Sequence, residues 1–368
     1  MLKFKNKTLL ITVITLSIFG IIMIYSASSI WAQYKYNDQF KYVKAQALFF
    51  IIGLVLMYIL SKVDYKIYEH KANKILLVCF ILLILVLIPG IGKLRNGSRS
   101  WFGIGSLGIQ PSEFAKTIII LFLASYYNIL IKNKEHNIIK YLIPLAVCFV
   151  IVFLVILQPD LGSAAIILGI TMLIFISLPM NKFVKEKSFK ILAGGIVIAL
   201  IGAVTIGPKV VSSYQVNRLT FTAPCTRYRE STGYQVCNGF IAIKNGGLFG
   251  LGFGNSTQKY LYLPEAHTDF IFPIICEELG AIVGAIIILG YGVMLWRILY
   301  IAKHANNVRN SVIAYGCFIY LSLHVLVNLL GALALVPLTG VPLPLLSYGG
   351  SFTLNAIVLL FLCQRVAI

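Results

Sequence analysis

The residues of this chain that are suited to chemistry are few, and three of them stand together in the stretch YLPEAHTDFIF, Tyr262–Phe272. Glu265, His267 and Asp269 precede a long apolar run, and carboxylates and imidazoles are the side chains that most often transfer protons in enzymes. Asp269 also has a plainer interpretation, because Thr268 or Asp269 can cap the first turn of a helix that begins there. The residue types leave both interpretations open.

A second candidate stretch is Gly92–Lys116, GKLRNGSRSWFGIGSLGIQPSEFAK. Its glycines argue against regular helix and indicate tight turns at a surface, and the PSE triplet then predicts a helix start with Glu113 in the first turn. Lys116 lies one turn from Glu113 and can form an ion pair with it. Trp101, beside Arg99, is by composition alone typical of an aromatic residue at a membrane interface.

Two further loops interrupt the apolar runs. In Leu157–Ala164, LQPDLGSA, the proline breaks a helix and Asp160 is expected to cap the next one, with a substrate role as the alternative. In Ala334–Leu354, ALVPLTGVPLPLLSYGGSFTL, three prolines exclude a continuous helix, and Ser351 can cap the last helix after the Gly-Gly turn. Non-helical backbone at membrane depth is tolerated where it lines a cavity, so this loop predicts one.

The longest loop, residues 209–269, contains a glycine run from Gly246 to Gly254. The run is neither a dinucleotide fingerprint nor a P-loop, because it lacks a strand–turn–helix context and a following Gly-Lys-Ser/Thr triplet. A loop this rich in glycine and aromatics indicates a folded-back cap with re-entrant pieces. Glu277 and Glu278 lie inside the next apolar run. They are expected to face protein and to pair structurally, since exposing them to lipid is costly.

These stretches are joined by apolar runs that are long enough to cross a membrane. The chain has 368 residues, of which 59% are hydrophobic and 12% charged, and its mean hydropathy is +0.90, more apolar surface than a single soluble core absorbs. A helix of about 18 residues or more spans a hydrocarbon layer of roughly 30 Å. We predict an all-α polytopic membrane protein, one integral membrane domain over residues 1–368, with ten spans: 8–30, 43–61, 73–91, 113–131, 139–157, 162–180, 188–208, 270–297, 310–333 and 351–364.

The distribution of lysine and arginine predicts the orientation of the spans. With the amino terminus inside, the inner segments and their flanks carry 18 Lys and Arg, whereas the outer loops 31–44 and 92–112 carry six, in agreement with the positive-inside rule. Both termini are therefore expected in the cytoplasm, and residues 209–269 outside it. The first run follows three lysines but is too long for a signal peptide. The net charge of +19 follows from topology and from attraction to anionic headgroups, and no basic stripe suggests nucleic-acid binding.

The seven cysteines fall into two groups. Five lie within predicted spans and are expected to be packing residues. Cys225 and Cys237 lie in the long outer loop, where oxidising conditions would let them pair. We expect a disulfide there, with a stabilisation of roughly 3 kcal/mol in the chain-entropy model, and two free thiols are the alternative. The sequence contains no His/Cys set with zinc spacing.

Five motifs occur in this order along the chain: QPSEFAK, QPDLGSA, GYQ…AIKNGGLFGLGFGNS, YLPEAHTDFIF with the EELG that follows it, and LPLLSYGGS. Together they resemble the SEDS family, which comprises FtsW, RodA and a related sporulation protein. The resemblance covers essentially the whole chain. It implies a ten-helix fold in the bacterial cytoplasmic membrane and peptidoglycan glycosyltransferase activity on lipid II, the undecaprenyl-pyrophosphate-linked disaccharide peptide. It also implies a class B penicillin-binding protein transpeptidase and other divisome or elongasome membrane proteins as partners.

The resemblance further implies roles for single residues. Asp269 occupies the aspartate position of the family's HTD motif, the residue held essential for polymerisation. Trp101 matches the tryptophan of the first large outer loop, and Glu113 matches the acid of the QPSE motif. Two features point to different branches, because the PLTG segment before SYGG is RodA-like and the 92–116 loop resembles the division and sporulation branch. The Cys225/Cys237 pair is not a family expectation.

The implied reaction requires one carboxylate and nearby positive charge. An acceptor sugar hydroxyl attacks an anomeric carbon, and a general base assists it by roughly 10²–10⁴-fold. Lipid pyrophosphate leaves as a stable anion, so that no general acid is needed, in contrast to glycosidases. Its charge needs cations or a divalent metal such as Mg²⁺ or Mn²⁺. We therefore expect Asp269 to be the base, and the candidate contacts to pyrophosphate and sugar are Trp101, Glu113, Lys116, Arg218 and Arg99.

Two other functions fit the same residues. A lipid II flippase would also need a cavity between broken helices and a basic pyrophosphate site, and it predicts polar residues along a path through the bundle. A non-catalytic scaffold for a penicillin-binding protein would make Asp269 dispensable.

Overall fold

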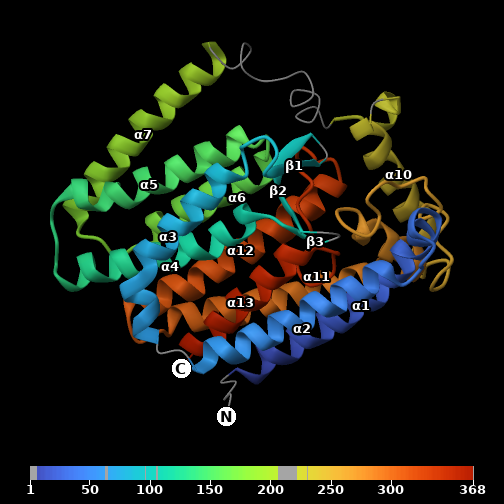
Figure 1. Cartoon of the computed structure of the whole chain (residues 1–368), viewed down its shortest axis with the longest axis horizontal. Helices are drawn as coiled ribbons and strands as arrows, with labels where there is room; N and C mark the ends of the chain where they lie inside the picture. Colours follow the sequence, from blue (N-terminus) through green and yellow to red (C-terminus); the bar gives the residue numbers. More distant parts are fainter. Residues whose placement is uncertain are drawn as a thin grey trace.

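The computed structural model describes residues 6–62, 65–95, 97–104, 107–205, 222–229 and 231–367, and helices make up most of the molecule (Figure 1). Each of the ten predicted spans coincides with a long helix, so the predicted helical architecture is confirmed. These helices are α1 (Lys7–Tyr36), α2 (Lys41–Lys62), α3 (Tyr65–Leu85), α4 (Pro111–Lys132), α5 (Ile138–Leu157), α6 (Leu161–Ser177), α7 (Lys182–Thr205), α11 (Ile271–Lys303), α12 (Val308–Ala332) and α13 (Gly350–Val366).

The helices differ in how well each is suited to cross a membrane. Within the described ranges, six are both long and apolar enough, namely α1, α2, α4, α5, α11 and α12. Helices α6 and α13 are apolar but have 17 residues each, close to the lower limit for a span. The third helix departs most from its predicted range of 73–91, because Pro89 and Gly90, whose φ is +91°, turn the chain after α3 toward the first strand.

Helices α4 and α12 lie at the centre of the bundle. Helix α4 packs against α3, α5, α6, α12 and α13, and α12 packs against α4, α6, α11 and α13. Their buried faces include Tyr127 and Tyr320, which are fully inaccessible to solvent. Helix α7 packs on α5 at the edge of the molecule (Figure 1). Since α4 and α12 are surrounded by other helices, side chains in their end turns have fixed positions.

The two ends of the described chain lie together at one end of the bundle (Figure 1). The Asn6 backbone N–H donates to Gln364 Oε1 at 3.1 Å, and Gln364 Nε2 donates to the Asn6 carbonyl at 2.8 Å. Adjacent termini agree with an even number of membrane crossings. Helix α13 runs from Gly350 to this end, so its first turn marks the opposite end of the bundle.

The connection between α3 and α4 forms a small sheet that the sequence analysis did not predict. Strands β1 (Gly92–Arg95), β2 (Ser98–Ile104) and β3 (Leu107–Ile109) are antiparallel in the order β1-β2-β3. The Lys93 side chain crosses Gly103 of β2, because a Cβ at Gly103 would lie 2.2 Å from the end of this side chain. The glycines that indicated turns thus also act as strand residues over which long side chains lie.

Residues 333–349, between α12 and α13, form an irregular segment inside the bundle, as the three prolines predict. Leu343 and Leu346 are fully buried. The backbone approaches α1 closely, because a Cβ at Gly20 would lie 2.2 Å from the Leu345 carbonyl oxygen. Non-helical backbone at this depth is therefore enclosed by protein, as a membrane protein requires.

The described part of the long loop contains two helical pieces before α11. They are a 3₁₀ turn, η1 (Pro224–Arg227), and α10 (Ser231–Gly246), which packs against η1 and α11. Helix α10 was not predicted as a separate element. Figure 1 shows it beside the end of α1 that lies farther from the termini.

Candidate active site

A cavity of about 270 Å³ opens at the end of the bundle opposite the termini. Segments from several parts of the sequence form it: the sheet with the first turn of α4, the first turn of α6, the stretch before α11, α12 and the irregular segment before α13. Its polar lining comprises Ser98, Ser100, Gln110, Glu113, Lys116, Asp160, Ser163, Glu265, Thr268, Asp269, His324, Thr339 and Tyr348. The predicted cavity next to the broken helix is thus present.

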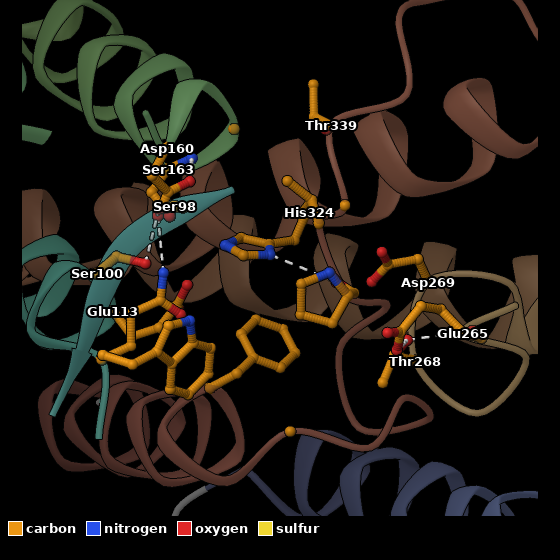
Figure 2. A pocket seen from close by; sticks show the side chains of 18 of the residues that line it. Ser98, Ser100, Glu113, Asp160, Ser163, Glu265, Thr268, Asp269, His324 and Thr339 are labelled. Atoms are coloured by element: carbon orange, nitrogen blue, oxygen red, sulfur yellow. Dashed lines mark hydrogen bonds between the residues drawn. The ribbon is translucent and has the colours of Figure 1, made fainter. Parts of the chain in front are cut away.

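The cavity brings together four of the five predicted catalytic and substrate-binding residues. Trp101, Glu113, Lys116 and Asp269 all line it. Figure 2 shows Asp269 on one side with Glu265 and Thr268, and Glu113 and Asp160 on the other. Arg218 lies outside the described residues. Arg99, which the sequence analysis also considered, is in β2 and is not among the lining residues.

Asp269 does not cap α11. The N-cap of this helix is Phe270, which has no side-chain capping bond, and the Thr268 hydroxyl donates instead to Glu265 Oε2 at 2.8 Å. Of the two interpretations that the sequence left open, the one in which Thr268 or Asp269 caps the helix is therefore wrong. The segment folds back on itself before the helix begins, because the N–H groups of Thr268 and Phe270 both donate to the Glu265 carbonyl. The side chain of Asp269 is half-buried in the cavity wall.

The backbone that carries Asp269 is held by three consecutive carbonyl groups. The Tyr348 N–H donates to the His267 carbonyl at 2.9 Å, and the Ser347 hydroxyl donates to the Thr268 carbonyl at 2.6 Å. Asn328 Nδ2, from α12, donates to the Asp269 carbonyl at 2.8 Å and to the Val341 carbonyl at 2.8 Å. These bonds fix the HTD backbone against α12 and against the loop before α13. Asn328 was not predicted.

The carboxylate of Asp269 lies against the backbone of Gly340. A Cβ at Gly340 would be 3.2 Å from Asp269 Oδ2, closer than an ordinary contact, and the φ of Gly340 is +71°. Both the close approach and the left-handed backbone favour glycine at this position. The irregular segment before α13 thus shapes the immediate surroundings of the carboxylate.

A buried cation lies on the other side of the cavity. Lys116 Nζ is 2.7 Å from Glu113 Oε1 and 3.3 Å from His324 Nε2, so the predicted Glu113–Lys116 ion pair is present. His324 Nδ1 is 3.4 Å from the Pro342 carbonyl, which favours the tautomer that donates from Nδ1 and accepts from Lys116. An ammonium has three N–H donors, and the structure gives Lys116 no third acceptor among the described residues. The remaining donor is available to a ligand in the cavity.

Glu113 contributes an acceptor of its own. Its side chain is almost fully buried, and its Oε2 has no hydrogen-bond partner in the described part of the chain. A buried carboxylate oxygen without a donor is costly. A hydroxyl or amide of a ligand in the cavity would satisfy it, while Oε1 keeps its bond to Lys116.

Asp160 has the capping role that the sequence predicted. Its Oδ1 accepts from the Ser163 N–H at 3.1 Å at the start of α6, and its Oδ2 accepts from Gln110 Nε2 at 2.7 Å. Ser351 differs from the prediction, because the N-cap of α13 is Gly349. The Ser351 hydroxyl accepts from the Gln110 N–H at 3.0 Å, which links α13 to the start of α4.

Trp101 is positioned by the sheet. It stands in β2 opposite Lys93 of β1, and the face of its ring covers Gly108 of β3. A Cβ at Gly108 would lie 2.8 Å from the ring atom Cε3. The ring is therefore part of the cavity wall, where an aromatic face can stack on a sugar ring, and it is half-buried rather than fully exposed at an interface.

Glu277 and Glu278 serve a structural purpose outside the cavity, in agreement with the prediction. Glu278 Oε1 is 2.9 Å from Lys259 Nζ, and the Ser26 hydroxyl of α1 donates to the same carboxylate. Glu277 accepts from the Thr257 hydroxyl at 2.8 Å and from the backbone and side chains of its neighbours in the loop. The two acids thus attach the loop after α10 to α11 and α1.

Cys225 of η1 and Cys237 of α10 form a disulfide, with Cα atoms 4.9 Å apart. The other five cysteines are free and buried, as expected for packing residues. The disulfide joins η1 to α10, and Asn238, next to Cys237, donates to the Tyr262 carbonyl at 3.2 Å. The cross-link therefore stabilises the loop from which the HTD stretch emerges.

Among the described residues there is no group of three or more His, Cys, Asp or Glu side chains that could hold a metal ion. Glu113 is already paired with Lys116, and Asp160 already accepts from the Ser163 N–H at the start of α6. Positive charge in the described lining comes from Lys116.

The arrangement of these motifs around one cavity agrees with comparisons to known proteins. The model of the cell cycle protein family FtsW/RodA/SpoVE matches residues 6–368. The chain belongs to the FtsW/RodA/SpoVE family. The resemblance found in the five sequence motifs is thereby confirmed.

Relatives in the family come from several bacteria. Stage V sporulation protein E of Bacillus subtilis is 39% identical over 95% of this chain and 93% of its own length. A probable peptidoglycan glycosyltransferase FtsW of Coxiella burnetii is 34% identical over 97% of this chain and 95% of its own length.

Two solved structures of the family share the fold. A chain from a peptidoglycan synthase complex, studied for its coordination of polymerization and crosslinking, has a TM-score of 0.75 and 26% identity and covers 100% of this chain and 98% of its own. The rod shape determining protein RodA of Thermus thermophilus has a TM-score of 0.68 and 26% identity over 98% of this chain and 96% of its own. The chain is thus a multi-pass membrane protein of the family, with its HTD, QPSE and SYGG motifs around one cavity.

Proposed function

We propose that this protein is a peptidoglycan glycosyltransferase that polymerises lipid II, with Asp269 as the general base. Membership of the family, whose relatives include probable peptidoglycan glycosyltransferases, supports the reaction. The observation that carries the proposal is that Asp269 and Lys116 line the same cavity. Glu113, whose Oε1 is 2.7 Å from Lys116 Nζ, lies across the cavity from Asp269 (Figure 2). A carboxylate and a cation in one cavity are what transfer from a lipid pyrophosphate requires.

The reaction forms one bond and breaks one. The oxygen of an acceptor sugar hydroxyl bonds to the anomeric carbon of the donor sugar, and the bond from that carbon to the pyrophosphate oxygen breaks. Asp269 takes the hydroxyl proton, and the electron pair of the broken bond leaves with the pyrophosphate. The leaving group is a stable anion and needs charge stabilisation rather than a proton.

Among the four carboxylates of the described lining, we infer that Asp269 is the base, because it occupies the aspartate position of the HTD motif and is partly exposed in the cavity. Glu113 is buried and pairs with Lys116, so its charge is already balanced. Asp160 accepts at both oxygens, from the Ser163 N–H in the first turn of α6 and from Gln110 Nε2 before α4. Glu265 accepts from the hydroxyl of its neighbour in the same turn. Asp269 is partly exposed in the cavity, and its backbone is fixed by the three carbonyl bonds described above.

The remaining residues fit the substrate. The third N–H of Lys116 would donate to a pyrophosphate oxygen, and Glu113 Oε2 would accept from a sugar hydroxyl or an amide. Trp101 would stack on a sugar face. Arg218, which lies outside the described residues, stays a candidate for a second contact to the pyrophosphate.

We further propose that both termini are cytoplasmic and that the cavity opens on the outer side of the membrane. The distribution of lysine and arginine supports this orientation. A class B penicillin-binding protein that cross-links the new strands is the proposed partner. The likeness to a chain of a peptidoglycan synthase complex supports a partner of this kind.

The test compares carboxylate variants of the purified protein in liposomes with fluorescent lipid II, with and without a penicillin-binding partner. Asp269→Asn is expected to lower the rate of glycan formation by at least 10²-fold, the lower range of a general base. Glu265→Gln, a neighbouring carboxylate in the same wall, is the matched control and is expected to stay within a few fold of wild type. Thermal unfolding of each variant shows whether it is folded.

Three results would contradict the proposal. Equal polymerisation by wild type and a folded Asp269→Asn variant would remove Asp269 as the base. Loss of activity in Glu265→Gln alone would transfer that role to Glu265. Movement of lipid II to the opposite leaflet without polymer would identify a flippase.

A further inference from the structure

The segment that follows α10, Gly247–Gly254, exposes large apolar side chains although it belongs to a loop. Phe249 is 80% exposed, and Leu248, Leu251 and Phe253 are also exposed. No charged residue occurs from Gly247 to Gln258. Exposed apolar side chains grouped in this way indicate a surface that is covered by another apolar phase.

The backbone of this segment is paired with α11. Helix α11 is interrupted at Gly280, whose φ is +84° and ψ is 168°. The carbonyls of Glu277 and Glu278 accept from the N–H groups of Leu251 and Gly252, each at 2.9 Å. In return, the N–H groups of Ala281 and Ile282 donate to the carbonyls of Gly247 and Leu248, at 2.9 and 3.3 Å. Four backbone groups of α11 next to the break are therefore paired with backbone groups of the loop rather than with water, as a segment in contact with lipid requires.

The pairing leaves no room for side chains between the loop and α11. A Cβ at Gly250 would lie 2.3 Å from the Glu278 carbonyl oxygen, and a Cβ at Gly280 would lie 2.2 Å from the Leu248 carbonyl oxygen. Glycine allows this close approach in the loop and in α11 alike. The larger side chains of the loop, which lie between its glycines, point away from α11 and are exposed. The loop is thus fixed at one level of α11.

The level of the loop follows from the length of α11. From Ala281, the first residue after the break, to Arg297 the helix advances by sixteen residues, or about 24 Å at 1.5 Å per residue, most of the ~30 Å thickness of the hydrocarbon layer. Arg297 lies at the end of the bundle that holds the termini, since its Nε is 3.4 Å from Asn6 Oδ1. The loop therefore lies at the opposite edge of the hydrocarbon layer, on the side of the cavity.

The apolar surface of the loop continues the lipid-facing surface of α11. Ile282, Ile286 and Leu289 of α11 are exposed, Leu289 by 68%. The backbone of Ile282 is bonded to that of Leu248, so the two apolar surfaces meet at this residue. Since α11 crosses the membrane, a lipid acyl chain that contacts the half of α11 nearer the cavity also reaches the loop.

We propose that Gly247–Gly254 is a lipid-contacting loop that places Leu248, Phe249, Leu251 and Phe253 in the membrane leaflet on the cavity side. The occupant of this surface is the lipid bilayer. This inference concerns how the protein sits in the membrane and does not depend on the proposed function.

The test measures the depth of nitroxide labels in lipid nanodiscs from their accessibility to oxygen and to a water-soluble nickel complex. Phe249→Cys is labelled beside two controls, Leu289→Cys on the lipid-facing side of α11 and Lys134→Cys in the exposed loop after α4. The five native free cysteines are buried and do not compete for the label. We expect the label at residue 249 to show an oxygen-to-nickel ratio several-fold above that at 134 and below that at 289. A label at Phe253→Cys is expected to give a ratio between those at residues 134 and 289 as well. This second position shows whether the result at residue 249 comes from a local disturbance by the label.

Two outcomes would overturn the proposal. A ratio at residues 249 and 253 equal to that at 134 would place the loop in water. Protection from both reagents in the purified protein would show that protein covers the surface, either the same chain or a second copy.

Discussion

The contact between Gly340 and Asp269 predicts that a single methyl group can impair the reaction without unfolding the protein. In Gly340→Ala, the new Cβ stands 3.2 Å from Asp269 Oδ2, and one of the two groups has to move by a few tenths of an ångström. Gly340 also has a φ of +71°, which costs an alanine about 1–2 kcal/mol of conformational energy. Gly90→Ala provides the matched control, because Gly90 has a φ of +91° but nothing within 4 Å of a Cβ.

The size of the effect follows from how sharply catalysis depends on position. A displacement of 1 Å at a reacting group costs roughly 10²-fold in rate, so a few tenths of an ångström cost roughly 3- to 10-fold. This corresponds to about 0.7–1.4 kcal/mol in the activation free energy. Both variants are expected to lose a similar amount of stability through backbone strain, and Gly340→Ala alone is expected to polymerise more slowly.

The assay is the rate of glycan formation from fluorescent lipid II at saturating substrate, together with the unfolding temperature of each variant. Wild type, Gly90→Ala and Gly340→Ala are compared in the same liposomes. Equal rates for the two alanine variants would refute the reasoning, because the carboxylate would then tolerate displacement or would not take part in the reaction.

Three further predictions follow from contacts around the site. Asn328→Leu retains most of the side-chain volume but leaves two buried carbonyls without a donor, so we expect it to cost about 1–3 kcal/mol for each carbonyl and to slow polymerisation; an unchanged unfolding temperature and rate would contradict this. Gly108→Val places atoms against the Trp101 ring, so KM for lipid II is expected to rise with little change in kcat, and an unchanged KM would exclude the stacking role. Cys225→Ser removes the cross-link to Cys237 and is expected to lower the free energy of unfolding by about 3 kcal/mol. The variant should therefore have a lower unfolding temperature than wild type, and a reductant should lower the unfolding temperature of wild type but leave that of the variant unchanged.

The helices were predictable because a membrane span is encoded by the composition of one local run. The sheet before α4 was not, since its pairing depends on contacts such as Lys93 over Gly103 and Trp101 over Gly108. These contacts become visible only when the strands are side by side. Helix α10 was missed for a related reason, because the glycine run after it dominates the pattern of that region.

The site shows a similar division. The pairing of Glu113 with Lys116 was predictable from a spacing of one helical turn, whereas the approach of both to Asp269 depends on the whole bundle. Asn328 escaped prediction, although an amide in the middle of an apolar run is a signal of function in membrane helices. Ser347 belongs to the SYGG motif, but a hydroxyl bonded to a distant carbonyl leaves no local pattern.

The three carbonyl bonds of the HTD stretch have a consequence for how a strand would grow. The backbone of His267, Thr268 and Asp269 is bonded to a central helix and to a buried loop, so the carboxylate has little freedom to travel between successive additions. In a processive polymerase of this design, the product moves while the base remains still. Each addition then requires translocation of the glycan by one disaccharide out of the cavity before the next acceptor hydroxyl can reach the carboxylate.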